Sequence, residues 1–153
     1  DAMLTISGLD CVQDRLDRLP KDVYSQNICG FSTDIPIEDN TFDAIIAGEF
    51  IEHLYPNDID TTLGELFRIL KVGGRLLLTT PNPEDIKKKW RKESVLSGAH
   101  LSQHFPQVLK LKLKMMGYTN IRLRGSGKVS RYLGYSFPML NLYGSYLLVA
   151  DKI

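Results

Sequence analysis

The sequence predicts an α/β fold built on a mostly parallel sheet, with an antiparallel pair of strands at its C-terminal edge. Short apolar segments typical of strands alternate with segments of helical periodicity along the 153 residues, and this alternation is typical of parallel-sheet folds. The last two strand candidates are separated by a loop rich in Gly and Pro, without a crossover helix. We therefore expect those two strands to run antiparallel.

Each element follows from a local pattern. Strand candidates are short, apolar and bounded by turn residues, at residues 3–9, 27–31, 42–47, 75–80, 120–123 and 146–150. Helix candidates have apolar residues three and four apart, at residues 12–19, 59–71 and 106–116. The run Pro56-Asn57-Asp58 is expected to supply a capping residue and early acidic charge for the second helix. Residues 110–114 alternate like a strand, but Pro106 suits a first helical position and Gly117 the position after a last one, so we predict a helix.

The strand at 42–47 is expected to lie near the centre of the sheet, because its apolar run does not alternate after Asp43. Gly48 and Glu49 follow it directly. In open α/β sheets, ligands bind at the carboxyl ends of the strands, so we expect a ligand cleft there. The residues expected to line it are Asp10, Phe31, Ser32, Gly48 and Glu49.

Composition argues against several classes of function. A formal net charge of +1 is too small for a dedicated nucleic-acid binder, and the basic run at 86–92 is best explained as a solvated helix face. No apolar run reaches the roughly 18 residues of a membrane span, and the first residues do not resemble a signal peptide. We interpret Cys11 and Cys29 as reduced thiols of a cytoplasmic protein, with a single bridge as the alternative.

Five segments, taken in order, carry a resemblance to a known family. They read ISGLD at 6–10, DIPIEDNTFD at 34–43, GEFIEHL at 48–54, FRILKVGG at 67–74 and TTPN at 79–82. This series resembles the class I S-adenosylmethionine (SAM)-dependent methyltransferases, in particular the type 11-like members. The resemblance implies a Rossmann-like three-layer sandwich and methyl transfer from SAM to an unidentified acceptor, a small molecule or a precursor.

The resemblance also implies roles for residues of the expected cleft. Asp10 matches the acidic residue that binds the ribose diol, with a helix cap as the alternative. Gly48 would let the cofactor approach the backbone, or simply form a turn. Glu49 is a candidate for the cofactor's amino group or a substrate hydroxyl, or a solvated acid. No catalytic residue is identified; the candidates are Glu49 and His53, whose imidazole suits a general base or a structural role.

The chain departs from the family pattern at its N-terminus. The family's first strand and glycine-rich loop should precede Asp10, where only nine residues stand. We therefore expect one domain over 1–153 that lacks this strand and loop, and that as given binds SAM weakly or not at all. The strands beginning at Met3 and Phe42 are expected to pair directly, or to have another segment between them, because buried unpaired backbone groups are costly.

A second departure is Phe31, which stands where the family usually has Asp to bind the adenine amino group. Phe31 could stack on adenine instead, and Asp34 is a nearby substitute. His100 and His104 are four residues apart, but without a third ligand nearby we predict no metal site. No GxGxxG follows a strand, which argues against a dinucleotide oxidoreductase. The alternative function is a non-catalytic or truncated domain acting through a partner, with no nucleic acid or membrane partner expected.

Overall fold

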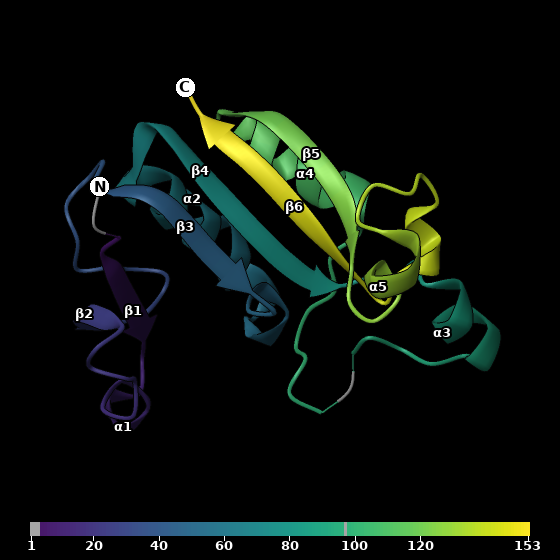
Figure 1. Ribbon diagram of the computed structural model, residues 1–153, viewed down its shortest axis with the longest axis horizontal. Helices are drawn as coiled ribbons and strands as arrows, with labels where there is room; N and C mark the ends of the chain where they lie inside the picture. Colours follow the sequence, from purple (N-terminus) through teal and green to yellow (C-terminus); the bar gives the residue numbers. More distant parts are fainter. Residues whose placement is uncertain (1–3, 97) are drawn as a thin grey trace.

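The computed structural model describes residues 4–96 and 98–153, so Met3 lies outside the described residues. Its strands form two separate sheets (Figure 1). The smaller sheet is the parallel pair of β1 (Ile6–Asp10) and β2 (Tyr24–Cys29). The larger has the order β3-β4-β6-β5, from β3 (Phe42–Gly48), β4 (Leu70–Pro81), β6 (Ser145–Lys152) and β5 (Tyr118–Ser126).

The strand directions confirm the α/β class and the antiparallel C-terminal edge. β3 and β4 run parallel, whereas β6 is antiparallel to both β4 and β5. The sheet is therefore mixed, with less parallel pairing than we predicted. Its parallel part contains β3, and the end of β3 carries the residues expected to bind a ligand.

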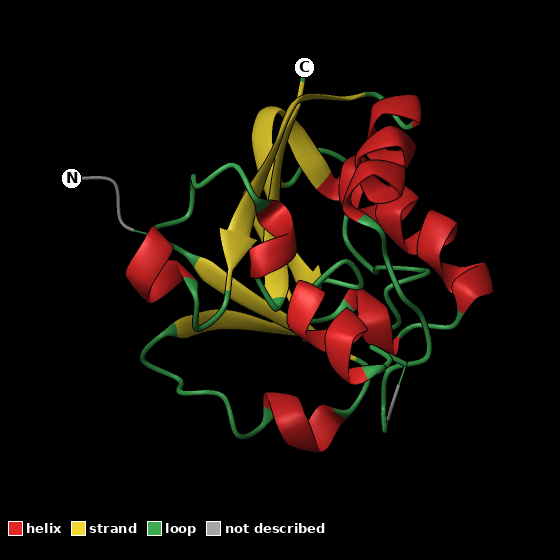
Figure 2. Cartoon of the chain, turned by 90° about the vertical axis from the view of Figure 1, so that its right-hand side faces the viewer, coloured by secondary structure: helices red, strands yellow, loops and turns green. Residues whose placement is uncertain are grey.

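Two long helices, α2 (Ile59–Ile69) and α4 (Pro106–Met115), cover the same face of the larger sheet. Figure 2 shows the strands in the interior with helices packed around them. Their apolar side chains pack on those of β4 and β6, including Leu63, Leu66, Leu109, Leu113, Leu76, Leu78 and Leu148. On the opposite face Ile46 is 79% exposed.

The remaining helical segments are short. They are α1 (Gln13–Leu16), α3 (Ile86–Arg91), α5 (Ser130–Leu133) and the 3₁₀ turns at Ile51–His53, Pro56–Asp58 and Leu140–Leu142. The basic side chains of α3 are mostly exposed, as predicted for a solvated face. Within the described residues, no helix has the length and apolar character needed to cross a membrane.

The ends of α4 agree with the prediction, whereas the C-terminal end of α2 differs from it. α4 begins at Pro106, and Gly117 just beyond it has a φ of 101°, so the proline and glycine predicted for the two helix ends are confirmed. α2 ends at Ile69 because Leu70 already pairs with Phe42 across an irregularity in the β3–β4 ladder. Asp58 occupies the N-cap position of α2, but its side chain makes no capping hydrogen bond.

The prediction that the strand at 42–47 is central was wrong for this chain. Among the described strands, β3 pairs with β4 alone and is therefore an edge strand. β1 and β3 do not pair, and no other described strand lies between them, so the expected closure is not found either. Unpaired backbone groups are costly only when buried, and this edge is open to solvent, where water can satisfy them.

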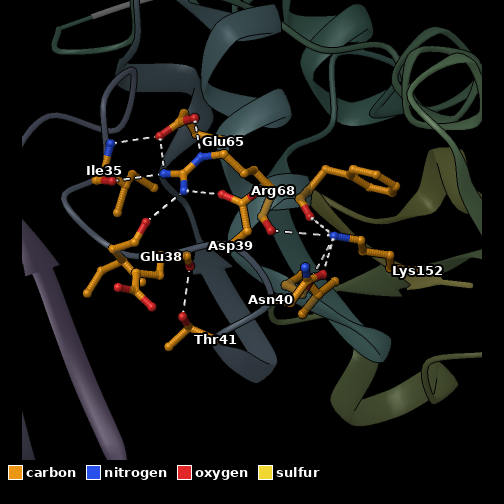
Figure 3. Close-up of polar contacts among 11 residues, drawn as sticks. Ile35, Glu38, Asp39, Asn40, Thr41, Glu65, Arg68 and Lys152 are labelled. Atoms are coloured by element: carbon orange, nitrogen blue, oxygen red, sulfur yellow. Dashed lines mark hydrogen bonds and ion pairs between the residues drawn. The ribbon is translucent and has the colours of Figure 1, made fainter.

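Two cations connect α2 to neighbouring segments (Figure 3). The guanidinium of Arg68 donates to both oxygens of Glu65, to Oδ1 of Asp39 at 2.8 Å, and to the carbonyls of Ile37 at 2.7 Å and Ile35 at 2.9 Å. These bonds fix the loop after β2 to α2. That loop also carries part of the expected ligand cleft.

The second cation, Lys152, lies at the end of α2. Its Nζ donates to the carbonyls of Phe67 and Leu70, both at 2.8 Å, and to Oδ1 of Asn40 at 2.9 Å. The ammonium also lies 4.6 Å from the centre of the Phe67 ring. Lys152 thereby supplies donors to carbonyls that the helix itself leaves without partners.

Candidate functional site

A cavity of 630 Å³ lies between the two sheets. One wall comes from β1 and the loop after β2, and the other from β3 and the turn that follows it. Its volume is within the roughly 300–1,000 Å³ typical of small-molecule sites. The lining includes polar, glycine and aromatic residues, among them Asp10, Gly30, Phe31, Ser32, Gly48 and His53.

The cavity brings together most of the residues that the sequence singled out. Asp10 and Gly48 are the last residues of β1 and β3, and both line it. Phe31, Ser32 and the candidate base His53 line it as well. Glu49 follows Gly48 but is not among the residues that line the cavity; its backbone N–H lies 3.0 Å from Oγ1 of Thr79.

The carboxylate of Asp10 closes a turn at the end of β1. Its Oδ1 accepts the N–H of Val12 at 2.8 Å, and its Oδ2 lies 3.6 Å from Arg15. Val12, rather than Asp10, occupies the capping position of α1. A carboxylate has about four lone-pair positions, so Asp10 keeps acceptor capacity for ligand hydroxyls in addition to this turn.

The loop after β2 presents Phe31 to the cavity. The Phe31 ring is 70% exposed and offers a flat apolar surface. Ser32 fixes the loop to α2 through a hydrogen bond of 3.0 Å between its hydroxyl and that of Thr62. Gly30 is required by close packing, since a Cβ there would lie 2.8 Å from the ring of Pro36.

Glu49 has a strained backbone directly after β3. Its φ is 45°, in the left-handed region that side chains other than glycine disfavour. The conformation is held by its N–H, which donates to the carbonyl of Thr79 at 2.9 Å. Burial, with a smaller effect of nearby Glu52, raises the pKa of the Glu49 carboxyl. Such strain is concentrated at functional sites.

We expect the Glu49→Gly variant to be about 1 kcal/mol more stable than the Glu49→Ala variant, because both lose the carboxyl and only glycine relieves the left-handed strain. Urea unfolding of the two variants measures this difference. Equal midpoints would show that the backbone at Glu49 is not strained.

The sequence did not predict the cluster formed by Glu52, His53 and His100. The rings of His53 and His100 lie edge to face with centroids 5.0 Å apart. Sequence spacing had instead grouped His100 with His104, which hydrogen-bonds Ser102 and whose pKa is lowered by burial. No local pattern connects His53 with a residue 47 positions later, and only the fold brings them together.

Comparison with known proteins is consistent with these observations. The family described as "Methyltransferase domain" matches residues 2–78. Among curated proteins, none matches. A SAM-dependent methyltransferase from Archaeoglobus fulgidus is similar in structure, with a TM-score of 0.72, 18% identity, and coverage of 95% of this chain and 75% of that chain.

Two further structures share the fold. A Thermotoga maritima SAM-dependent methyltransferase, described as a possible histamine N-methyltransferase, has a TM-score of 0.74, 15% identity, and coverage of 96% of this chain and 72% of its own. One from Methanosarcina mazei has a TM-score of 0.67, 15% identity, and coverage of 97% and 82%. At such identities the likeness shows the fold alone.

Proposed function

The chain belongs to the methyltransferase domain family, and on this basis we propose that it takes part in methyl transfer from SAM to a small-molecule or precursor acceptor. The observation that carries the proposal is that Asp10 and Gly48, at the ends of two parallel strands, line one cavity. Ligands bind at this position in open α/β sheets.

The residues present fit the cofactor's chemistry. The Asp10 carboxylate accepts hydrogen bonds of the kind a ribose diol donates, and the exposed Phe31 ring suits stacking on a base. Gly48 has no side chain, so a ligand can approach the end of β3 closely. SAM, when bound, supplies an electrophilic methyl group on its sulfonium sulfur. The chain's contribution is then mainly to bind and orient the reactants.

We propose Glu49 or His53, which lie just after the end of β3, as the group that accepts a proton from the methyl acceptor. His53 has its Nδ1 3.1 Å from the carbonyl of Ala99, and because a carbonyl only accepts, Nδ1 must carry the hydrogen. The free acceptor is Nε2. Burial raises the pKa of Glu49, which brings a carboxylate toward the range of a general base.

Titration of ¹⁵N-labelled protein with SAM tests this function. We expect weak binding, with amide shifts at Asp10, Gly30 and Gly48. The Asp10→Asn variant should bind about tenfold more weakly, because hydrogen bonds to a charged acceptor contribute about 1.5–3 kcal/mol. Asp14→Asn in α1 is the matched control and should bind as the parent does. Shifts confined to other regions, or equal effects of the two substitutions, would contradict the assignment.

A second candidate function is a non-catalytic domain that acts through a partner. It is favoured by the unpaired edges of β1 and β3, since exposed sheet edges can accept an added strand. A chain that shows no cofactor-dependent shifts at the cavity would favour this alternative. We also propose a cytoplasmic location, because Cys11 and Cys29 are free and exposed, as is usual in reducing compartments.

A further inference from the structure

Glu52, His53 and His100 form a cluster of possible metal ligands beside the cavity. One ligand atom from each side chain lies within 4.8 Å of the others. Glu52 and His53 belong to the 3₁₀ turn after β3, and His100 belongs to the segment before α4. Two imidazoles and one carboxylate form a donor set found in zinc sites that have three protein ligands.

Both histidines are held in the form that binds metals. Nδ1 of His53 lies 3.1 Å from the carbonyl of Ala99, and Nδ1 of His100 lies 2.9 Å from the carbonyl of Val95. A carbonyl oxygen only accepts, so each Nδ1 carries a hydrogen and each Nε2 presents a lone pair. Metal-binding histidines are oriented by such bonds from their second nitrogen.

Glu52 supplies an independent observation that a ligand belongs here. Its side chain is buried, at 2% exposure. Oε2 accepts the hydroxyl of Thr80 at 3.0 Å, but Oε1 is buried and has no hydrogen-bond partner among the described residues. A buried carboxylate oxygen left unpaired is costly. A cation between this carboxylate and the two imidazoles would supply the missing partner.

We propose that Glu52, His53 and His100 bind a first-row divalent cation of the Zn²⁺ type. Imidazole nitrogen favours such ions, whereas Mg²⁺ prefers a shell of oxygens. Ligand atoms in a tetrahedral zinc site lie about 3.4 Å apart, given Zn–N bonds of about 2.0–2.1 Å. The cluster is wider than this, so metal binding would draw the exposed His53 side chain toward Glu52 and His100.

Metal binding at this cluster does not depend on methyl transfer. It would, however, occupy Nε2 of His53, which lines the cavity. Glu49 would then be the remaining proton acceptor at the end of β3. Three protein ligands also leave one coordination position open, as in catalytic zinc sites.

Competition with a chromophoric zinc chelator tests the site. The 153-residue chain should carry Cys11→Ser and Cys29→Ser, since exposed thiols bind zinc themselves. We expect one equivalent of Zn²⁺ to bind. Glu52→Gln and His100→Ala should each weaken binding by more than about tenfold, since even outer-shell changes have effects of this size. Glu93→Gln, an exposed carboxylate, is the control and should bind as the parent does.

Circular dichroism of each variant shows whether it is folded, and His53→Ala, at an exposed position, tests the same site should His100→Ala misfold. Bound Co²⁺ should give visible bands without thiolate charge transfer. Failure of the parent chain to bind Zn²⁺ would overturn the proposal, as would binding that survives in all three ligand variants. Equal competition by Mg²⁺ would overturn the assigned class of cation.

Discussion

Replacement of Arg68 by alanine is expected to lower the free energy of unfolding by about 2–3 kcal/mol. The guanidinium holds Glu65, Asp39 and two loop carbonyls, and removing one partner of a buried ion pair is reported to cost about 3–5 kcal/mol. Because the Arg68 side chain is 30% exposed, we reduce that figure for solvent screening. Urea unfolding of the Arg68→Ala variant gives the value.

Lys71→Ala is the matched control for Arg68→Ala. Lys71 pairs with Asp43 on the surface, where both side chains are largely exposed, and such pairs contribute about 0–1 kcal/mol. Equal destabilisation by the two substitutions would show that the Arg68 network adds nothing beyond a surface ion pair.

The same network predicts a dependence on pH. Hydrogen bonding to Arg68 lowers the pKa of the Glu65 carboxyl. A carboxyl with a lowered pKa in the folded state stabilises the fold above its ordinary pKa, and this stabilisation is lost as the pH falls through the lowered value. The Arg68→Ala variant should therefore lose less stability than the parent over that acidic range.

Substitution of Lys152 by methionine is expected to destabilise the fold by about 3 kcal/mol. Methionine matches the length of the stem but leaves the carbonyls of Phe67 and Leu70 and the amide of Asn40 without their donor. Each unsatisfied buried group costs about 1–3 kcal/mol, and Lys152 is only 9% exposed. Thermal and urea unfolding measure the loss.

Lys114→Met, at an exposed position of α4, controls for the change in charge and should change stability by less than about 0.5 kcal/mol. A Lys152→Met protein as stable as Lys114→Met would mean that water replaces the ammonium at the end of α2 without cost.

Local sequence signals predicted helix ends correctly where a residue type favours a single position in a helix. Pro106 and Gly117 located α4 because proline and glycine each favour one position at a helix end. The gathering of Asp10 and Gly48 at one cavity was also expected, since residues at the ends of parallel strands meet at one edge. Neither signal reports on distant residues, and the sequence therefore could not group His100 with His53.

The position of β3 shows the limit of such signals. Its apolar run indicates that its faces favour burial, but it does not say which strands pair with its edges. The contacts at the end of α2 are likewise set by distant residues. Arg68 bonds the preceding loop, and Lys152, distant in sequence, supplies the cation at the helix end.

The free edge of β3 also affects how copies of the chain meet in concentrated solution. Along Ala44, Ile45 and Ile46 it presents backbone donors and acceptors without the lysine or proline that natural edge strands use against self-association. Asp43 is the sole charged residue of this strand. The edge of β3 that faces the cavity is thus also a template for intermolecular β-pairing. A ligand or segment that covers this edge, between β1 and β3, would therefore raise the solubility of the chain.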